Sequence, residues 1–182
     1  MVKRPIQDLS EEHGAIMLML KIMEKVAKKL KRGEDVDKYH LKKIVEFLKN
    51  FADRCHHGKE EGILFPELVK KAANRIIVNE LLGEHKTGRD FIRGMAESLV
   101  GYKPGNPDAI HIAVNAQGYI QLLTEHIRKE NILFTRVDKQ LSKKLQGKIE
   151  ERFENLERDV IGIGKHEEYH GWLKKFKEIY LV

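Results

Sequence analysis

The chain of 182 residues contains one cysteine, four prolines and no long apolar run. Cys55 alone cannot form an intrachain disulfide, which favours a reducing compartment. The longest apolar run, Ala15 to Leu20, is far shorter than the roughly 20 residues that span a bilayer. The first residues, Met1 to Pro5, lack the apolar core of a signal peptide. We therefore expect a cytoplasmic protein without a membrane partner.

The chain also lacks a basic tail and has no aromatic residues interleaved with its lysines. Its net charge of +6 is spread as mixed lysine and glutamate, which is typical of a solvated surface and does not indicate a nucleic-acid partner. With 41% hydrophobic residues and no clear strand-turn-strand signal, the sequence favours one all-α domain with a substantial core. The composition does not determine the oligomeric state.

Helical periodicity divides the sequence into successive amphipathic segments. The predicted helices cover about residues 8–32, 37–66, 74–101 and 108–140, followed by one beyond Ser142 and a short one after the glycines at 162 and 164. We therefore assign residues 1–141 to a four-helix unit. Residues 142–182 form a C-terminal helical extension that we expect to pack on the same domain.

A histidine-glutamate motif occurs twice in this frame. His57 and Glu61 are four residues apart and precede Ile63-Leu64-Phe65, and His126 and Glu130 precede Ile132-Leu133-Phe134 in the same way. A histidine and a glutamate at this spacing lie on one helix face and can reach one metal ion. Upstream of each motif stands a Glu-His pair, which contains His13 in the first copy and His85 in the second. The chain thus resembles two copies of one metal-donating helix pair.

The phase of the first motif conflicts with a regular α-helix. At 100° per residue, His57 lies about 180° from Leu48, which belongs to the apolar stripe of the same predicted helix. Either this helix is buried on nearly all sides, or a one-residue bulge near residues 53–57 turns the donors inward. We favour the bulge, since such bulges often occur at functional sites.

Imidazole and carboxylate donors suit iron, zinc or manganese, and the absence of cysteine clusters argues against iron–sulfur and structural zinc sites. Two glutamates on opposing helices can bridge two metal ions, with four histidines at the ends. Together with one bridging oxygen they fill ten of about twelve positions around two six-coordinate ions. The remaining positions suit a small diatomic ligand.

The residues His13, His57-x-x-x-Glu61, His85 and His126-x-x-x-Glu130 resemble the hemerythrin-like (HHE cation-binding) domain over about residues 8–140. The resemblance implies an up-down four-helix bundle, here with one or two additional C-terminal helices. It also implies two non-haem iron ions with an oxo or hydroxo bridge. By the same resemblance Glu61 and Glu130 are bridging ligands, and the four histidines are terminal ligands.

The sequence departs from the oxygen-carrying hemerythrins in two respects. The third predicted helix has one histidine, since Leu81 and Arg89 occupy the positions four residues before and after His85. The last carboxylate is a glutamate four residues after its histidine, where those proteins have an aspartate five residues after it. A fifth histidine is therefore missing from the predicted set. His166, His170 and Glu60 are the candidates for extra ligands, whereas we interpret Cys55 and His56 as supporting residues and His40 and His111 as surface residues.

A competing motif lies in the last helix, where His166-Glu167-Glu168-Tyr169-His170 fits the His-Glu-x-x-His pattern of zinc metalloproteases. The residues after it contain no histidine to complete a zinc site, and no strand is predicted to hold a peptide. We therefore do not interpret the chain as a protease.

Three functional hypotheses follow. The first is a di-iron protein that binds or senses O2, NO or iron, and is not itself an enzyme. The alternative is a di-iron enzyme of the peroxidase, NO-reducing or iron–sulfur-cluster repair type. The third is a metal-free helical interaction module.

Overall fold

A computed structural model describes residues 4–181, and all regular structure in this range is helical. This confirms the predicted all-α fold. Residues 1–3 and residue 182 lie outside the described residues. They include part of the segment examined for a signal peptide, the start of the predicted unit 1–141 and the end of the predicted extension 142–182. Between residues 4 and 181, no helix combines the length and the apolar character needed to cross a membrane.

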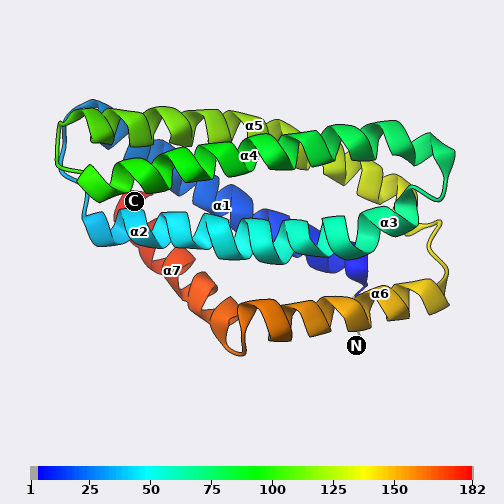
Figure 1. Ribbon diagram of the computed structural model, residues 1–182. Helices are drawn as coiled ribbons and strands as arrows, with labels where there is room; N and C mark the ends of the chain where they lie inside the picture. Colours follow the sequence, from blue (N-terminus) through cyan, green and yellow to red (C-terminus); the bar gives the residue numbers. More distant parts are fainter. Residues whose placement is uncertain (1–3, 182) are drawn as a thin grey trace.

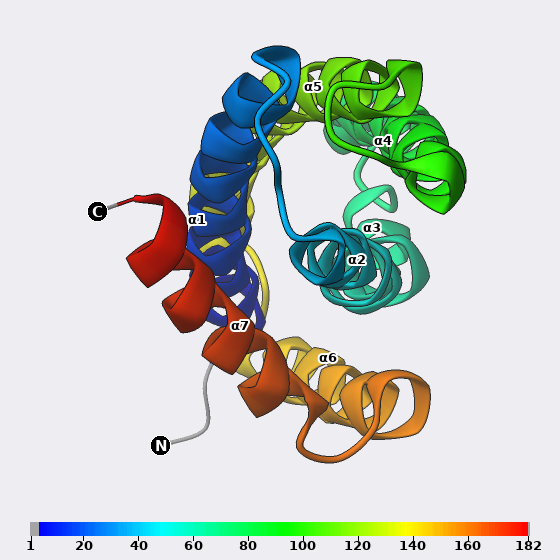
Figure 2. The same cartoon turned by 90° about the vertical axis from the view of Figure 1, so that its left-hand side faces the viewer.

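Four long helical segments lie side by side along one axis (Figure 1). The first is α1 (Pro5–Lys31), and the last two are α4 (Arg75–Gly101), preceded by the short η3 (Ala72–Asn74), and α5 (Pro107–Asp138). The second segment is continuous and consists of α2 (Lys38–Phe47), η1 (Leu48–His57), η2 (Glu60–Leu64) and α3 (Phe65–Leu68). Viewed along the axis, α1, α5, α4 and α2 follow one another around a common centre (Figure 2).

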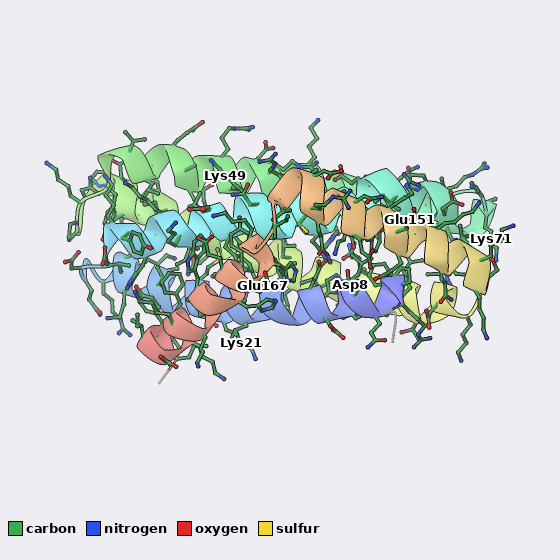
Figure 3. The ribbon with its side chains drawn as sticks, turned by 90° about the horizontal axis from the view of Figure 1, so that it is seen from below. Asp8, Lys21, Lys49, Lys71, Glu151 and Glu167 are labelled. Carbon is green, nitrogen blue, oxygen red and sulfur yellow. The ribbon has the colours of Figure 1, made fainter. Side chains whose placement is uncertain are left out.

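The C-terminal extension consists of α6 (Lys143–Leu156), η4 (Glu157–Ile161) and α7 (Lys165–Tyr180). Gly162 and Gly164, with φ of 100° and 78°, make the turn between η4 and α7 in a backbone region that favours glycine. Both helices lie on the side of α1 and α2 that faces away from α5 (Figure 2), and they stand in front of these segments in Figure 3. The extension packs on the first two segments, since α7 and α6 contact α1, and η4 contacts η1.

Short polar side chains begin three of the helices. Asp37 accepts a hydrogen bond from the backbone N–H of Tyr39 (2.8 Å), and Asn106 accepts one from Ala109 (3.0 Å). Ser142 does the same at the start of α6. Such caps satisfy backbone donors that have no partner within the helix. They explain why the predicted helix starts lie close to the observed ones.

The second segment departs from the α-helix, as the phase conflict predicts. Residues 48–57 and 60–64 are π-helical, and the backbone N–H of Gly58 donates to the carbonyl oxygen of Asp53, five residues earlier. The wider turn changes the direction in which successive side chains point. Leu48 and His57 are consequently both buried, at 0% and 2% exposure. The predicted bulge is confirmed, and it is longer than one residue.

Two apolar clusters fill the interior at opposite ends of the bundle axis. On α1, Leu9 belongs to one cluster and Ile16 to the other, and His13 lies between them. Ile149 and Phe153 of α6 complete the cluster that contains Leu9. His13 therefore lies between two apolar cores.

Candidate metal centre

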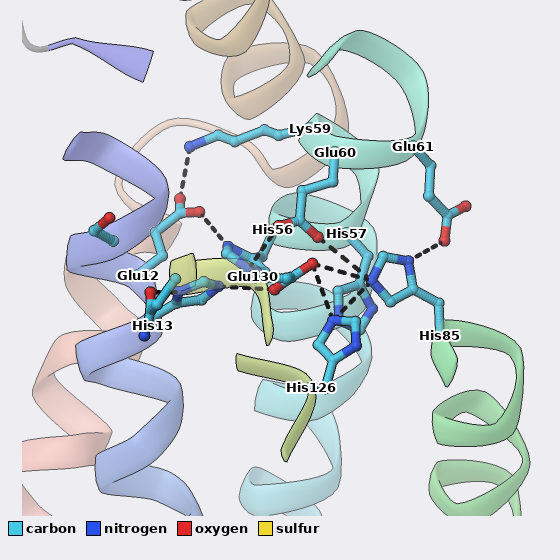
Figure 4. Close-up of polar contacts among 12 residues, drawn as sticks. Glu12, His13, His56, His57, Lys59, Glu60, Glu61, His85, His126 and Glu130 are labelled. Atoms are coloured by element: carbon cyan, nitrogen blue, oxygen red, sulfur yellow. Dashed lines mark hydrogen bonds and ion pairs between the residues drawn. The ribbon is translucent and has the colours of Figure 1, made fainter. Parts of the chain in front are cut away.

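Five histidine side chains from four helical segments point into one buried space (Figure 4). They are His13 of α1, His56 and His57 of η1, His85 of α4 and His126 of α5. Each is at most 3% exposed. The π-helix accounts for the adjacent pair, because it directs two consecutive histidines toward the interior.

Glu60 lies among these rings and is fully buried. Its Oε1 is 3.4 Å from Nε2 of His56, and its Oε2 is 3.4 Å from Nε2 of His85. The two oxygens of one carboxylate thus face histidines on different helices. This is the arrangement that a bridging carboxylate requires.

Glu130 repeats the arrangement from α5 and is also fully buried. Its Oε2 is 3.0 Å from Nε2 of His13, and its Oε1 is 3.1 Å from Nε2 of His126. The same Oε1 is 3.8 Å from Nε2 of His85. Two carboxylates therefore each span the same two sets of histidines.

The donor atoms form two groups in which all ligand atoms lie within 4.8 Å of one another. One group, which we call the three-histidine subsite, contains His57, His85, His126 and Glu60. The other, the two-histidine subsite, contains His13, His56, Glu60 and Glu130. Because Glu60 belongs to both and Glu130 contacts both, the subsites share their carboxylates.

Several of these buried atoms have no hydrogen-bond partner. They are Nε2 of His56, Nε2 of His57, both carboxylate oxygens of Glu60, and Oε1 of Glu130. A buried polar atom without a partner costs about 1–3 kcal/mol, so such atoms rarely gather in one place. Here they converge, and two metal ions would satisfy all of them. The residues present thus fit a pair of cations.

The electrostatics of the centre agree with this interpretation. Burial, together with the nearby Glu130 carboxylate, raises the pKa of Glu60 well above its usual value. Burial also acts to raise the pKa of Glu130, but hydrogen bonds from His126 and His13 outweigh it and lower that pKa well below the usual value. Two carboxylates this close cannot both be ionised easily without a cation between them. Burial lowers the pKa of His56 to about 4, which keeps the ring in the neutral form that binds metals.

The Nδ1 atoms of the histidines point outward to acceptors in a duplicated pattern. His56 Nδ1 donates to Glu12 (2.8 Å), and His126 Nδ1 donates to Glu84 (2.9 Å). Glu12 immediately precedes His13, just as Glu84 immediately precedes His85. These bonds fix each ring with Nε2 facing the centre, as in known metal sites.

The remaining rings follow the same rule. His85 Nδ1 donates to Glu61 (2.7 Å), and His13 Nδ1 donates to Asn131 (3.0 Å). Glu61 and Asn131 are the residues directly after Glu60 and Glu130. His57 is the exception to the duplication, and its Nδ1 lies 3.3 Å from Asp53 on its own helix.

The structure brings together five of the six core ligands that the sequence predicts, namely His13, His57, His85, His126 and Glu130. It does not bring Glu61 into either subsite. The Glu61 side chain is 29% exposed and accepts a hydrogen bond from Arg89 (2.6 Å) on the outer side of the His85 ring (Figure 4). Glu60, predicted as a spare donor, takes the central position in its place.

The fifth histidine comes from the π-helix and not from the extension. His56, interpreted from the sequence as a supporting residue, lies inside the centre. His166 stops outside it, with Nε2 3.6 Å from Oε1 of Glu12, and neither His166 nor His170 belongs to either subsite.

A different alignment of the two copies would have identified both residues. Matching the Ile-Leu-Phe tails pairs Glu61 with Glu130 and leaves His56 without a counterpart. Matching the donors pairs His56 with His126 and Glu60 with Glu130, each 70 residues apart. The alignments differ because the π-helical turn over residues 60–64 adds one residue between the carboxylate and the tail.

A family model described as Hemerythrin HHE cation binding domain matches residues 4–137 of the chain. Neither the curated proteins nor the solved structures include a significant match. The matched range ends in the last turn of α5, before the C-terminal extension, and includes every histidine and carboxylate of the two subsites.

Proposed function

The chain belongs to the hemerythrin HHE cation-binding family, and on this premise we propose that it holds two non-haem iron ions and binds or senses a small diatomic ligand, O2 or NO. The convergence of unpartnered imidazole and carboxylate atoms between two apolar clusters carries the proposal. Imidazole and carboxylate without thiolate is a donor set that suits iron.

We propose the following ligand set. His57, His85 and His126 hold one ion, His13 and His56 hold the other, and Glu60 and Glu130 bridge them. Bound iron would supply redox chemistry and an affinity for diatomic molecules. The chain supplies neutral imidazoles, buried carboxylates and the exclusion of bulk water.

The donor count supports one open position. Five imidazoles, four carboxylate oxygens and one shared bridging oxygen fill eleven of about twelve positions around two six-coordinate ions. The two-histidine subsite has one imidazole fewer than its neighbour. The diatomic ligand is therefore expected at the ion held by His13 and His56.

The proposal extends to the arrangement of the helices and to the location of the protein. The side-by-side packing of the four long segments supports an up-down four-helix bundle over residues 1–141, with residues 142–182 as an extension packed on it. A cytoplasmic location and the lack of a nucleic-acid partner stay predictions.

Metal analysis of protein purified without oxygen tests the proposal. We expect close to two iron ions per chain and a visible absorption change when NO or azide is added. Stoichiometric zinc without iron would contradict the proposal. Turnover of peroxide or NO that disappears in Glu130→Ala would instead assign the enzymatic alternative, because binding alone consumes no substrate.

A further inference from the structure

Lys59 is an unusual feature of the two-histidine side of the molecule. Its side chain is fully buried, and its Nζ contacts the carboxylates of Asp8 (2.6 Å), Glu12 (2.6 Å) and Glu157. A buried ammonium group is tolerated only with such compensation. Glu12 in turn accepts the hydrogen bond from Nδ1 of His56. Lys59 therefore sets the orientation of the acceptor that fixes a proposed metal ligand.

The second half of the centre contains a similar cluster, which differs in its number of carboxylates and in its exposure to solvent. Lys129, directly before Glu130, contacts Glu80 and Glu84, and Glu84 accepts the hydrogen bond from His126. All of these residues belong to α4 and α5, and the Lys129 side chain is 24% exposed. This cluster contains only two carboxylates and is open to solvent.

The third carboxylate of the first cluster comes from the C-terminal extension. Glu157 of η4 reaches Lys59, and His166 of α7 lies 3.6 Å from Oε1 of Glu12. Phe153 of α6 covers the Lys59 ammonium at 5.3 Å from its ring centre. These residues lie outside the range that matches the family model. The extension thus adds contacts that the family domain does not supply.

Glu157 and His166 also lie between the cluster and one region of the surface. A surface pocket of about 210 Å³ is lined by Glu157 and His166, together with the turn at residues 161–164. From this pocket inward, Glu157 contacts Lys59, Lys59 contacts Glu12, and Glu12 contacts His56. On the side of this pocket, Glu157 and His166 consequently lie between solvent and the hydrogen bond of His56.

From this geometry we infer that Glu157 and His166 are positioning residues for the metal centre. Through Lys59 and Glu12 they hold the His56 ring and shield its Nδ1–H, so the extension makes the two-histidine subsite chemically different from its neighbour. The inference rests on the proposed function only in requiring that metal binds at these histidines. It does not depend on iron or on a diatomic ligand.

The test uses the full chain loaded with zinc, with ¹⁵N-labelled histidine observed by NMR. Glu12→Ala and Glu84→Ala identify the Nδ1–H signals of His56 and His126 by their loss. In Glu157→Gln we expect the His56 signal to exchange with solvent at least about tenfold faster and the second zinc to bind about tenfold more weakly. A tenfold decrease is the lower end of the loss of metal affinity that follows when the hydrogen-bond partner of a metal-binding side chain is removed. The His126 signal should stay unchanged.

Glu80→Gln is the control in the other half, since Glu80 contacts Lys129 as Glu157 contacts Lys59. It should leave the His56 signal unaffected. His166→Gln is a second variant and should shift the same His56 signal by a smaller amount. If Glu157→Gln alters both histidine signals equally, or neither, the inference is overturned.

The outcomes also separate this inference from the proposed function. Zinc binding with an unaltered His56 signal overturns the inference alone. Zinc binding with the expected change, in a protein that takes up no iron when purified without oxygen, overturns the di-iron proposal alone. A failure to bind any metal overturns both.

Discussion

The two halves of the centre carry matching side chains in different surroundings. Asp8, Glu12 and His13 of α1 stand 72 residues before Glu80, Glu84 and His85 of α4, and His56, Lys59 and Glu60 stand 70 residues before His126, Lys129 and Glu130 of α5. His57 has no histidine counterpart, since Ile127 occupies that position. One additional histidine therefore turns a symmetric donor set into a three-histidine and a two-histidine subsite.

The two halves also differ in how far matching residues are shielded from solvent. Ile63 and Ile132 occupy matching positions in the Ile-Leu-Phe tails, yet Ile63 is 5% exposed under α6 and Ile132 is 62% exposed. Lys59 is fully buried, whereas Lys129 is partly exposed. The comparison teaches that a repeated sequence can place the same chemical groups once in a buried environment and once in a solvent-exposed one.

The largest expected effect distinguishes Glu60 from Glu61. Glu60→Ala removes a carboxylate shared by both subsites, and we expect metal content to fall from two ions to at most one per chain. Glu61→Ala removes only the acceptor for His85 Nδ1, so two ions should still bind, with affinity weakened about 10–100-fold. Metal analysis and competition with a chelator measure both quantities. Retention of both ions in Glu60→Ala, with loss in Glu61→Ala, would restore the sequence-based choice of Glu61.

The second prediction compares the matching isoleucines. Ile63→Ala deletes buried apolar atoms beneath α6 and should lower the free energy of unfolding by about 2–4 kcal/mol. Ile132→Ala deletes mostly exposed atoms and should change it by less than about 0.5 kcal/mol. Urea unfolding of the two variants checks the difference. Equal effects would show that α6 does not cover the first half in solution.

The smallest effect concerns Glu150 on α6, which faces the acidic surroundings of Lys59. Burial, reinforced by Asp8 and Glu154, raises the pKa of Glu150 to about 7. The folded state therefore binds this proton more tightly than the unfolded state, and stability falls as pH rises from about 4.5 to about 7. Glu150→Gln removes the titrating group and with it the loss of stability at high pH. We therefore expect this variant to be more stable than the wild type at pH 8 by about 1 kcal/mol, given partial screening by solvent.

The difference between Glu150→Gln and the wild type should largely disappear at pH 4, where the carboxyl group is mostly protonated in both states. Urea unfolding at the two pH values measures it. A constant difference across this range would mean that the Glu150 carboxyl group does not titrate with the raised pKa.

Much of the fold could be predicted from local signals. Helical periodicity, the cap at Asp37 and the glycines at 162 and 164 gave helix limits within a few residues of those observed. The histidines at 13, 85 and 126 lie in apolar stripes of regular α-helices, so the 3.6-residue period placed them correctly inside the bundle. The second segment could not be treated in this way, because its π-helical turns break that period.

Glu60 and His56 show why the remaining part needed the structure. Adjacent residues such as Glu60 and Glu61 differ by about 100° in direction on an α-helix, and a π-turn changes which of the two faces inward. The sequence supplied both candidates but had no local rule to choose between them. The contribution of Glu157 and His166 was equally hidden, since it joins residues about a hundred or more positions from Lys59 and Glu12.

The sequence by itself determined that the chain is helical, that it carries two copies of a histidine-carboxylate pair, and that these pairs suit a metal ion. Spacing along a helix sets all three, and spacing is a local property. The tertiary structure decided which glutamate lies between the subsites, that His56 is the fifth histidine, and that only one half is sealed by the extension. These depend on backbone register and on which distant helix covers which face, and both are set by packing across the whole molecule.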